Sequence, residues 1–114
     1  MSHVIEVSTR TRGDVSIIEI KGDLTTVTGE RVEAVYQQMS ADGSKKILLF
    51  FDKDCYINSG GIATLIGMVS ESIDREQVLR IAGLSDHFQK IFAMVGLTRY
   101  AAIFASEEAA LEGF

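Results

Sequence analysis

The sequence predicts a single α/β domain in which a mixed, mainly parallel β-sheet carries helices. From about residue 26 onward, apolar runs of strand length alternate with helical apolar stripes, an order that favours crossover connections in a parallel sheet. The residues before this alternating part contain two strand-like runs joined by a short turn, which predicts an antiparallel hairpin at one edge of the sheet. The 114 residues are 46% hydrophobic and lack proline, so one core and one domain over 1–114 are expected.

The opening hairpin is predicted from residues 4–8, which alternate apolar and polar side chains, and from the β-branched residues 15–20. Residues 11–14 contain Gly and Asp and supply the turn, and Gly22 with Asp23 is expected to end the second strand. A helix then begins near Thr26 or Thr28, either of which has a hydroxyl suited to capping it. Its apolar stripe consists of Val32, Val35, Tyr36 and Met39.

The central strand is predicted at residues 46–51, a nearly continuous apolar run typical of a strand buried on both faces. A second helix begins at Ser59, and 78–82 form a further strand. Residues 88–95 form a third helix ended by Gly96, 100–104 a short strand, and 106–111 a last acidic helix capped by Ser106. The stripe expected to face the core on the second helix is Ile62, Leu65, Ile66, Val69 and Ile73.

Composition excludes several classes of function. A net charge of -5 argues against direct nucleic-acid binding, which needs clustered basic residues. Cys55 stands alone, so an intramolecular disulfide or a cysteine-based metal site is not expected, and His3 and His87 lack the spacing of metal ligands. No apolar run approaches the roughly 20 residues that cross a bilayer, and no signal peptide is visible. We therefore expect a cytoplasmic, non-enzymatic protein without metal or cofactor.

Two enzymatic or signalling alternatives have little support. Asp52 and Asp54 follow the central strand as in receiver domains, but the acidic pair and the lysine that a receiver needs are not in place. These aspartates are interpreted as turn residues, and Cys55 as a small buried residue. A nucleotide-binding or enzymatic domain is also disfavoured, because residues 83–86 lack the glycine and lysine spacing of a phosphate loop.

The most informative segment, residues 55–66, joins a strand end to a helix start, where ligands of open parallel sheets usually bind. Ser59 is predicted either to cap this helix or to present an exposed hydroxyl there, and the two roles are compatible. Gly60 and Gly61 weaken the first turn, which indicates either a tight turn or room for a partner's backbone beside Ser59. A phosphate on Ser59 would lie next to free helix amides, a favourable place for an anion.

Residues 56–62, Tyr-Ile-Asn-Ser-Gly-Gly-Ile, resemble the aromatic-Ile-Asp-Ser-Ser-Gly-Leu signature of STAS-domain anti-sigma factor antagonists. The likeness covers nearly the whole chain. Residues 20–24 resemble the family's Gly-acid-Leu turn, residues 88–97 its Leu-Phe-x-x-x-Gly-Leu element, and residues 103–111 its carboxyl end. The resemblance implies a sheet of four or five strands with about four helices mainly on one side.

It also implies partner switching. In this family the antagonist binds an anti-sigma factor that is also a serine kinase; phosphorylation, here at Ser59, releases it, and a metal-dependent serine phosphatase resets it. Met68 lies off the predicted apolar stripe and is interpreted as a partner contact. The partner surface implied for this chain comprises Gly22, Asp23, Thr25, Asn58, Ser59, Gly60, Gly61, Ala63, Gly67 and Met68.

The chain departs from the family pattern at three positions. Asn58 replaces the signature's aspartate, Gly60 its second serine, and Thr25 an acidic residue common after the turn. Asn58 keeps an acceptor oxygen but removes a charge near the target hydroxyl. The alternative function is therefore a STAS subunit of a transport or signalling assembly that is never phosphorylated.

Overall fold

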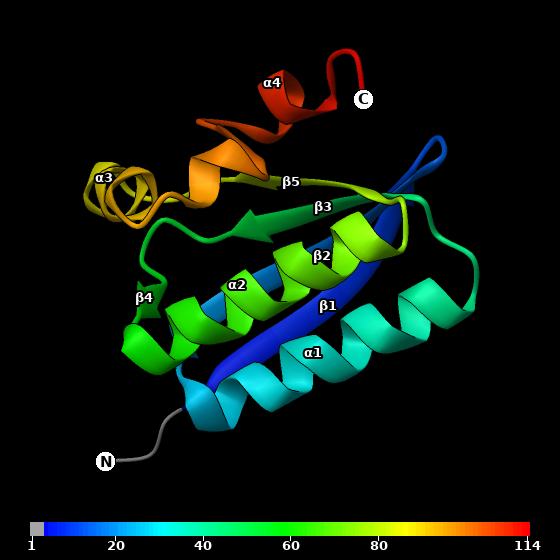
Figure 1. Ribbon diagram of the computed structural model, residues 1–114. Coiled ribbons are helices and arrows are strands. Elements are labelled where there is room, and N and C mark those ends of the chain that lie inside the picture. The colour runs from blue at the N-terminus through cyan, green and yellow to red at the C-terminus, as the bar shows by residue number, and fades with distance from the viewer. Residues whose placement is uncertain (1–3) are drawn as a thin grey trace.

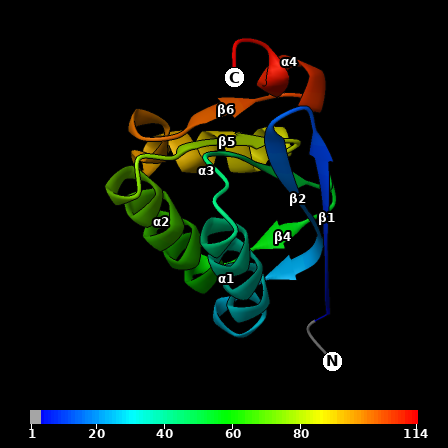
Figure 2. The same ribbon diagram turned by 90° about the vertical axis from the view of Figure 1, so that its right-hand side faces the viewer.

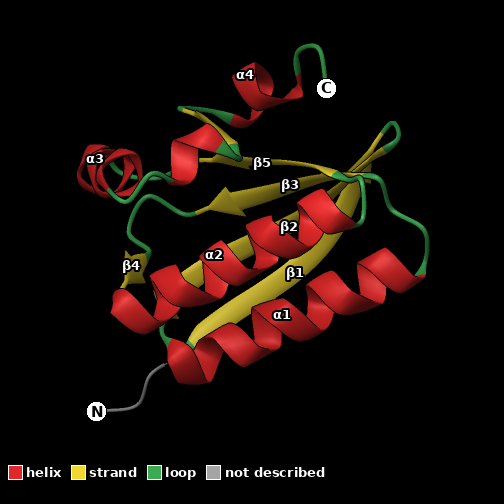
Figure 3. Ribbon diagram, viewed as in Figure 1, coloured by secondary structure: helices red, strands yellow, loops and turns green. Residues whose placement is uncertain are grey.

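The computed structural model describes residues 4–114, which form a six-stranded mixed sheet with the order β1-β2-β3-β5-β6 and β4 paired to β2 (Figures 1 and 3). β1 and β2 form an antiparallel hairpin, and the other pairings are parallel. His3 lies outside the described residues. The strands are β1 (Ile5–Arg12), β2 (Val15–Leu24), β3 (Lys46–Phe51), β4 (Tyr56–Ile57), β5 (Val78–Ala82) and β6 (Ala102–Phe104).

Helices make the parallel connections. The helices are α1 (Thr26–Ala41), α2 (Ser59–Asp74), α3 (Asp86–Met94), the single 3-10 turn η1 (Leu97–Arg99) and α4 (Glu107–Leu111). Because successive crossovers lead from β2 to β3, β5 and β6 in one direction across the sheet, a constant handedness places α1, α2 and α3 on the same face. Figure 2 shows α1 and α2 on one side of the sheet and α4 on the other. The expected α/β architecture is confirmed.

Two apolar clusters follow from the two-residue period of the strands. On β2, Ile18 and Ile20 face the cluster beneath α1–α3, whereas Val15 and Ile17 face the opposite cluster. β3 alternates in the same way, and its residues 47–49 are fully buried, which explains its continuous apolar sequence. The α4 face has the smaller cluster, closed by Ala110 and the partly buried Phe50, Phe104, Leu111 and Phe114.

Three arginines attach α4 to the sheet. Arg10 pairs with both carboxylate oxygens of Glu107, and Arg12 donates to Glu107 at 2.9 Å and to Glu108 at 2.8 Å. At the other end of α4, Arg80 donates to the carbonyl oxygens of Ala110, Glu112 and Gly113 at 2.8–3.0 Å. These bonds join residues far apart in sequence and hold α4 over the face that α1–α3 leave uncovered.

Several local expectations are confirmed and others are corrected. The strands at 46–51 and 78–82, the Ser106 cap and the end of α3 just before Gly96 are found as predicted, and Gly96 adopts a left-handed conformation. The hairpin is longer than predicted, since β1 reaches Arg12 and β2 continues through Gly22 to Leu24. β4 was not predicted, because a two-residue strand lacks a readable alternation.

Candidate functional site at the start of α2

The backbone around Ser59 is held by the end of β2. β4 pairs in parallel with Asp23 and Leu24, and the N–H of Asn58 donates to the carbonyl oxygen of Leu24 at 3.1 Å. The chain then turns into α2, whose first residue is Ser59. The start of α2 is thus positioned by a segment about 35 residues earlier in the sequence, the β2–α1 junction (Figure 1).

Asn58, rather than Ser59, is the N-cap of α2. Its Oδ1 accepts the N–H of Gly61 at 2.9 Å, and its carbonyl oxygen accepts the N–H of Ile62 at 2.9 Å. Asparagine is among the strongest capping residues, so it does here what an aspartate at this position would do without adding a charge. The prediction that the Ser59 hydroxyl caps the helix is therefore wrong.

Ser59 occupies the first helical position and is exposed. Within residues 4–114 its hydroxyl has no hydrogen-bond partner, and neither do the backbone N–H groups of Ser59 and Gly60. Such first-turn amides cannot bond within their own helix and carry the positive end of its dipole. The site therefore combines an accessible nucleophilic hydroxyl with donors that favour a negative group beside it.

The two glycines after Ser59 are required by close packing. A Cβ on Gly61 would overlap the carbonyl oxygen of Leu24, and one on Gly60 would overlap the hydroxyl of Thr26. Gly61 is buried, and the space over Gly60 is already filled by Thr26. The contact of Gly61 with the Leu24 backbone confirms the tight-turn interpretation, and room for a partner's backbone beside the exposed Ser59 stays a prediction.

The N-terminus of α1 lies beside that of α2, but its cap is Thr25 and not Thr26 or Thr28. Thr25 accepts the N–H of Thr28 at 3.2 Å, and the Thr28 hydroxyl accepts the N–H of Thr25 at 2.8 Å, which completes a reciprocal capping box. The Thr25 side chain is only 6% exposed. Its predicted contact with a partner is corrected, because the side chain is used inside the fold.

The outer side of α2 presents Ser59, Ala63 and Gly67, which recur every four residues and are all exposed. We call these three residues the Ser59 face. Met68, also expected on this side, is 0% exposed and packs in the main core, so that prediction is wrong. Conversely, Ile66 and Ile73 are 44% and 51% exposed, although the sequence stripe placed them in the core.

Two exposed apolar side chains belong to the segments next to Ser59, β4 and the start of α1. Tyr56, three residues before Ser59, is 56% exposed, and its ring meets Phe88 edge-on with the ring centroids 6.1 Å apart. Val27, next to Thr26 at the start of α1, is 72% exposed. Gly22 and Asp23, at the end of β2, are half-buried. Tyrosine is among the residues enriched at the energetic centres of protein interfaces, so Tyr56 is the stronger candidate for a partner contact.

The remaining candidate residues have structural roles. The pKa of the Cys55 thiol is raised to about 12, mainly by burial and further by the nearby carboxylates of Asp23 and Asp52. Such a thiol stays protonated and unreactive at neutral pH. Asp52 and Asp54 are exposed in a turn, where the Asp52 carboxylate accepts the N–H of Asp54 at 3.2 Å. Between residues 4 and 114, no three His, Cys, Asp or Glu side chains are grouped so as to hold a metal ion, and no helix is long and apolar enough to span a membrane.

Comparison with known proteins identifies the family. The family model of the STAS domain matches residues 6–110. The chain belongs to the STAS domain family. The anti-sigma-B factor antagonist of Staphylococcus aureus is 25% identical to this STAS protein over 93 residues, which are 82% of this chain and 86% of that relative.

Solved structures share the STAS fold. An anti-sigma factor antagonist from Mycobacterium paratuberculosis has a TM-score of 0.82 at 15% identity, covering 95% of this chain and 92% of the other. The phosphorylated form of the Bacillus cell fate determinant SpoIIAA has a TM-score of 0.64 at 18% identity, covering 93% and 96%. At these identities the likeness establishes the fold.

Proposed function

We propose that this STAS protein is an anti-sigma factor antagonist that binds an anti-sigma factor through the Ser59 face. The observation that carries the proposal is the exposed, unbonded hydroxyl of Ser59 at the first position of α2. It lies in the segment that resembles the family signature, and the Staphylococcus aureus relative is an anti-sigma-B factor antagonist. The exposed Tyr56 and Val27 supply apolar area for the contact.

We further propose that the partner is a serine kinase that phosphorylates Ser59, and that a metal-dependent serine phosphatase reverses the step. A phosphate there would carry a charge of about -1.5 to -2 at neutral pH. The free amides of the first turn of α2 stabilise that charge in the unbound protein, whereas an interface docked over it would have to desolvate it. Phosphorylation thus leaves the fold intact and weakens binding.

The proposed partner surface is smaller than the sequence suggested. It comprises the Ser59 face with Asn58, Gly60, Gly22 and Asp23 at its margin. Thr25, Gly61 and Met68 contribute through the fold, since their side chains or Cα atoms are buried. Mutations at these three positions should therefore affect stability before they affect recognition.

The test measures binding of purified variants to a purified anti-sigma factor with a serine kinase domain, by isothermal titration calorimetry. Ser59→Asp should weaken binding about tenfold or more, and Ser59→Ala should leave it within about twofold. Ser70→Asp is the matched control, because Ser70 is also exposed on α2 but lies three turns further along. Equal binding by Ser59→Asp and wild type would contradict the switch.

The alternative is a STAS subunit of a transport or signalling assembly that is never phosphorylated. Asn58 favours it, because the signature's aspartate is absent beside the target hydroxyl. Phosphosite mapping by mass spectrometry of protein recovered from its own cells separates the two. A phosphate on Ser59 supports the switch, and persistent absence of phosphate with a co-purifying transporter supports the alternative.

A further inference from the structure

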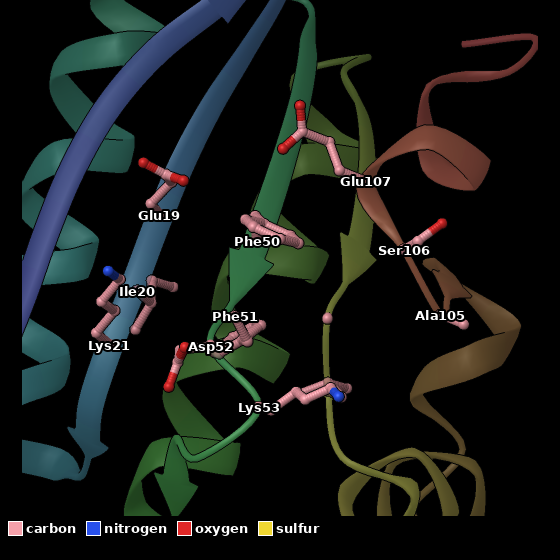
Figure 4. A pocket seen from close by; sticks show the side chains of 12 residues that line it. Glu19, Ile20, Lys21, Phe50, Phe51, Asp52, Lys53, Ala105, Ser106 and Glu107 are labelled. Carbon is pink, nitrogen blue, oxygen red and sulfur yellow. The ribbon is translucent and has the colours of Figure 1, made fainter.

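A cavity of about 270 Å³ lies on the sheet face opposite α1–α3, between the carboxyl ends of β2 and β3 and the start of α4 (Figure 4). Ligands of open α/β sheets bind outside the carboxyl ends of the strands, which is where this cavity opens. Drug-sized molecules occupy sites of roughly 300–1,000 Å³, so this one suits a smaller ligand. The Ser59 face, Tyr56 and Val27 are not part of its lining.

The floor of the cavity is aromatic. Phe50 is half-buried, and its ring lies between the side chains of β2 and those leading into α4 (Figure 4). Gly83, with a positive φ of 87°, follows β5 at the cavity wall. A Cβ there would overlap the carbonyl oxygen of Phe51 and come within 3.1 Å of the Phe50 ring. The glycine thus leaves the ring where a flat ligand can pack against it.

Of the three acidic side chains that line the cavity, Glu19 and Glu107 are paired with an arginine and, within residues 4–114, Asp52 is not. Glu19 pairs with Arg10 at 3.4 Å, and Glu107 is held by the same guanidinium. The Asp52 carboxylate accepts the backbone N–H of Asp54 at 3.2 Å. The arginine contacts lower the pKa of Glu107 to about 2, so this carboxylate is charged and compensated at neutral pH.

The cationic side chains of the cavity have no such partners. The ammonium groups of Lys21 and Lys53 form neither an ion pair nor a hydrogen bond with any residue between 4 and 114. Figure 4 shows Lys53 extending from the end of β3 toward the segment that follows β5. Within the described part of the chain, two unpaired ammonium groups against one unpaired carboxylate, that of Asp52, leave a net positive charge that the cavity does not compensate, although the chain as a whole has a net charge of -5.

We propose that this cavity binds a small molecule with one aromatic ring and one acidic group. The ring packs on Phe50, and the acidic group pairs with the ammonium of Lys53, with Lys21 on the far side. A neutral ring would lose the ion pair, and a small carboxylate without a ring would lose the packing. The proposal is independent of whether Ser59 binds an anti-sigma factor.

Benzoate is the probe, titrated into ¹⁵N-labelled protein and followed by NMR, with benzyl alcohol, acetate and benzylamine as comparison ligands. Benzoate should shift the amides of residues 50–53 and 83 saturably, with a Kd on the order of millimolar for so small a ligand. Benzyl alcohol should bind more weakly, and acetate and benzylamine should not saturate. Equal binding of benzoate and benzyl alcohol, or benzoate shifts outside the cavity, would overturn the proposal.

Variants at Lys53 test the charge. Lys53→Gln should weaken benzoate binding about three- to fivefold, as expected for a partly exposed ion pair, and leave benzyl alcohol unchanged. Lys53→Glu should transfer the preference from benzoate to benzylamine. Lys90→Gln, on the exposed surface of α3, is the matched control and should have no effect. Unchanged benzoate binding in both Lys53 variants would show that the cavity does not select anions.

Discussion

The closeness of α2 to β2 can be tested with two identical substitutions in one helix. Gly61 and Gly67 both lie in α2. A Cβ on Gly61 would overlap the carbonyl oxygen of Leu24, and it would lie 2.8 Å from the carbonyl carbon of Leu24 and 3.0 Å from Cγ2 of Ile57. A Cβ on Gly67 would meet no atom within 4 Å. Both Gly→Ala changes reduce the freedom of the unfolded chain equally, so the difference between their effects on stability reports the clash together with the smaller helix preference of a first-turn position.

The two substitutions should change the free energy of unfolding in opposite directions. Overpacking against backbone costs about 1–3 kcal/mol, and a first-turn position recovers only part of the helix preference of alanine. Gly61→Ala should therefore lower the free energy of unfolding by about 1–2 kcal/mol. Gly67→Ala, exposed in mid-helix, should raise it by about 0.5–1 kcal/mol.

Urea denaturation followed by circular dichroism is the assay. With an m-value of about 2 kcal/mol per molar urea, the midpoint of Gly61→Ala should fall by roughly 0.5–1 M, while that of Gly67→Ala rises. The m-values should remain equal, since both variants keep the same fold. A Gly61→Ala protein as stable as Gly67→Ala would refute the packing described for the start of α2.

Two further predictions concern the α2 cap and the α4 ion pairs. Asn58→Ala should lower the free energy of unfolding by about 1 kcal/mol, because the N–H of Gly61 loses its acceptor. Asn58→Asp should keep this free energy or raise it slightly, because a negative charge at the N-terminus of α2 interacts favourably with the helix dipole. Thermal unfolding of the wild type and the two variants measures the effect, and an Asn58→Ala protein as stable as wild type would contradict the cap. The pKa of Glu107 is lowered to about 2 by Arg10 and Arg12, so its ion pairs stabilise the fold above the unfolded pKa of about 4.5 and this contribution is lost as the pH falls toward 2. Denaturation midpoints between pH 7 and about pH 2 should thus fall less steeply in Glu107→Gln than in wild type, and parallel profiles would argue against the pairs.

Local features of the sequence were sufficient for much of the fold. The strands at 46–51 and 78–82, the cap at Ser106 and the end of α3 at Gly96 depend on neighbours within a few residues along the chain. The order of strands and helices then determined the mainly parallel sheet, because crossovers have one hand. Ser59 was also placed correctly at an exposed helix start.

Side-chain periodicity did not determine which side of α2 is buried. The helix has apolar residues on several sides, so Ile66 and Ile73 matched a stripe as well as Met68 did. Which side of α2 is buried depends on its packing against both the sheet and α1, where Thr64 of α2 lies against Gly29. This second neighbour rotates the buried face toward Met68 and leaves Ile66 and Ile73 exposed.

The sequence by itself determined the α/β fold of these residues and the serine at the start of α2, because those features follow from short-range pattern and chain order. Only the tertiary structure decided that Asn58 is the cap, that Gly60 and Gly61 serve packing, and that Thr25 and Met68 are buried. Gly60 and Gly61 pack against atoms of the β2–α1 junction, which the sheet brings beside α2 and which the local sequence of α2 does not contain. The Asn58 cap is a local bond to Gly61, but the neighbouring Ser59 also carries a capping oxygen, so the local sequence did not choose between the two.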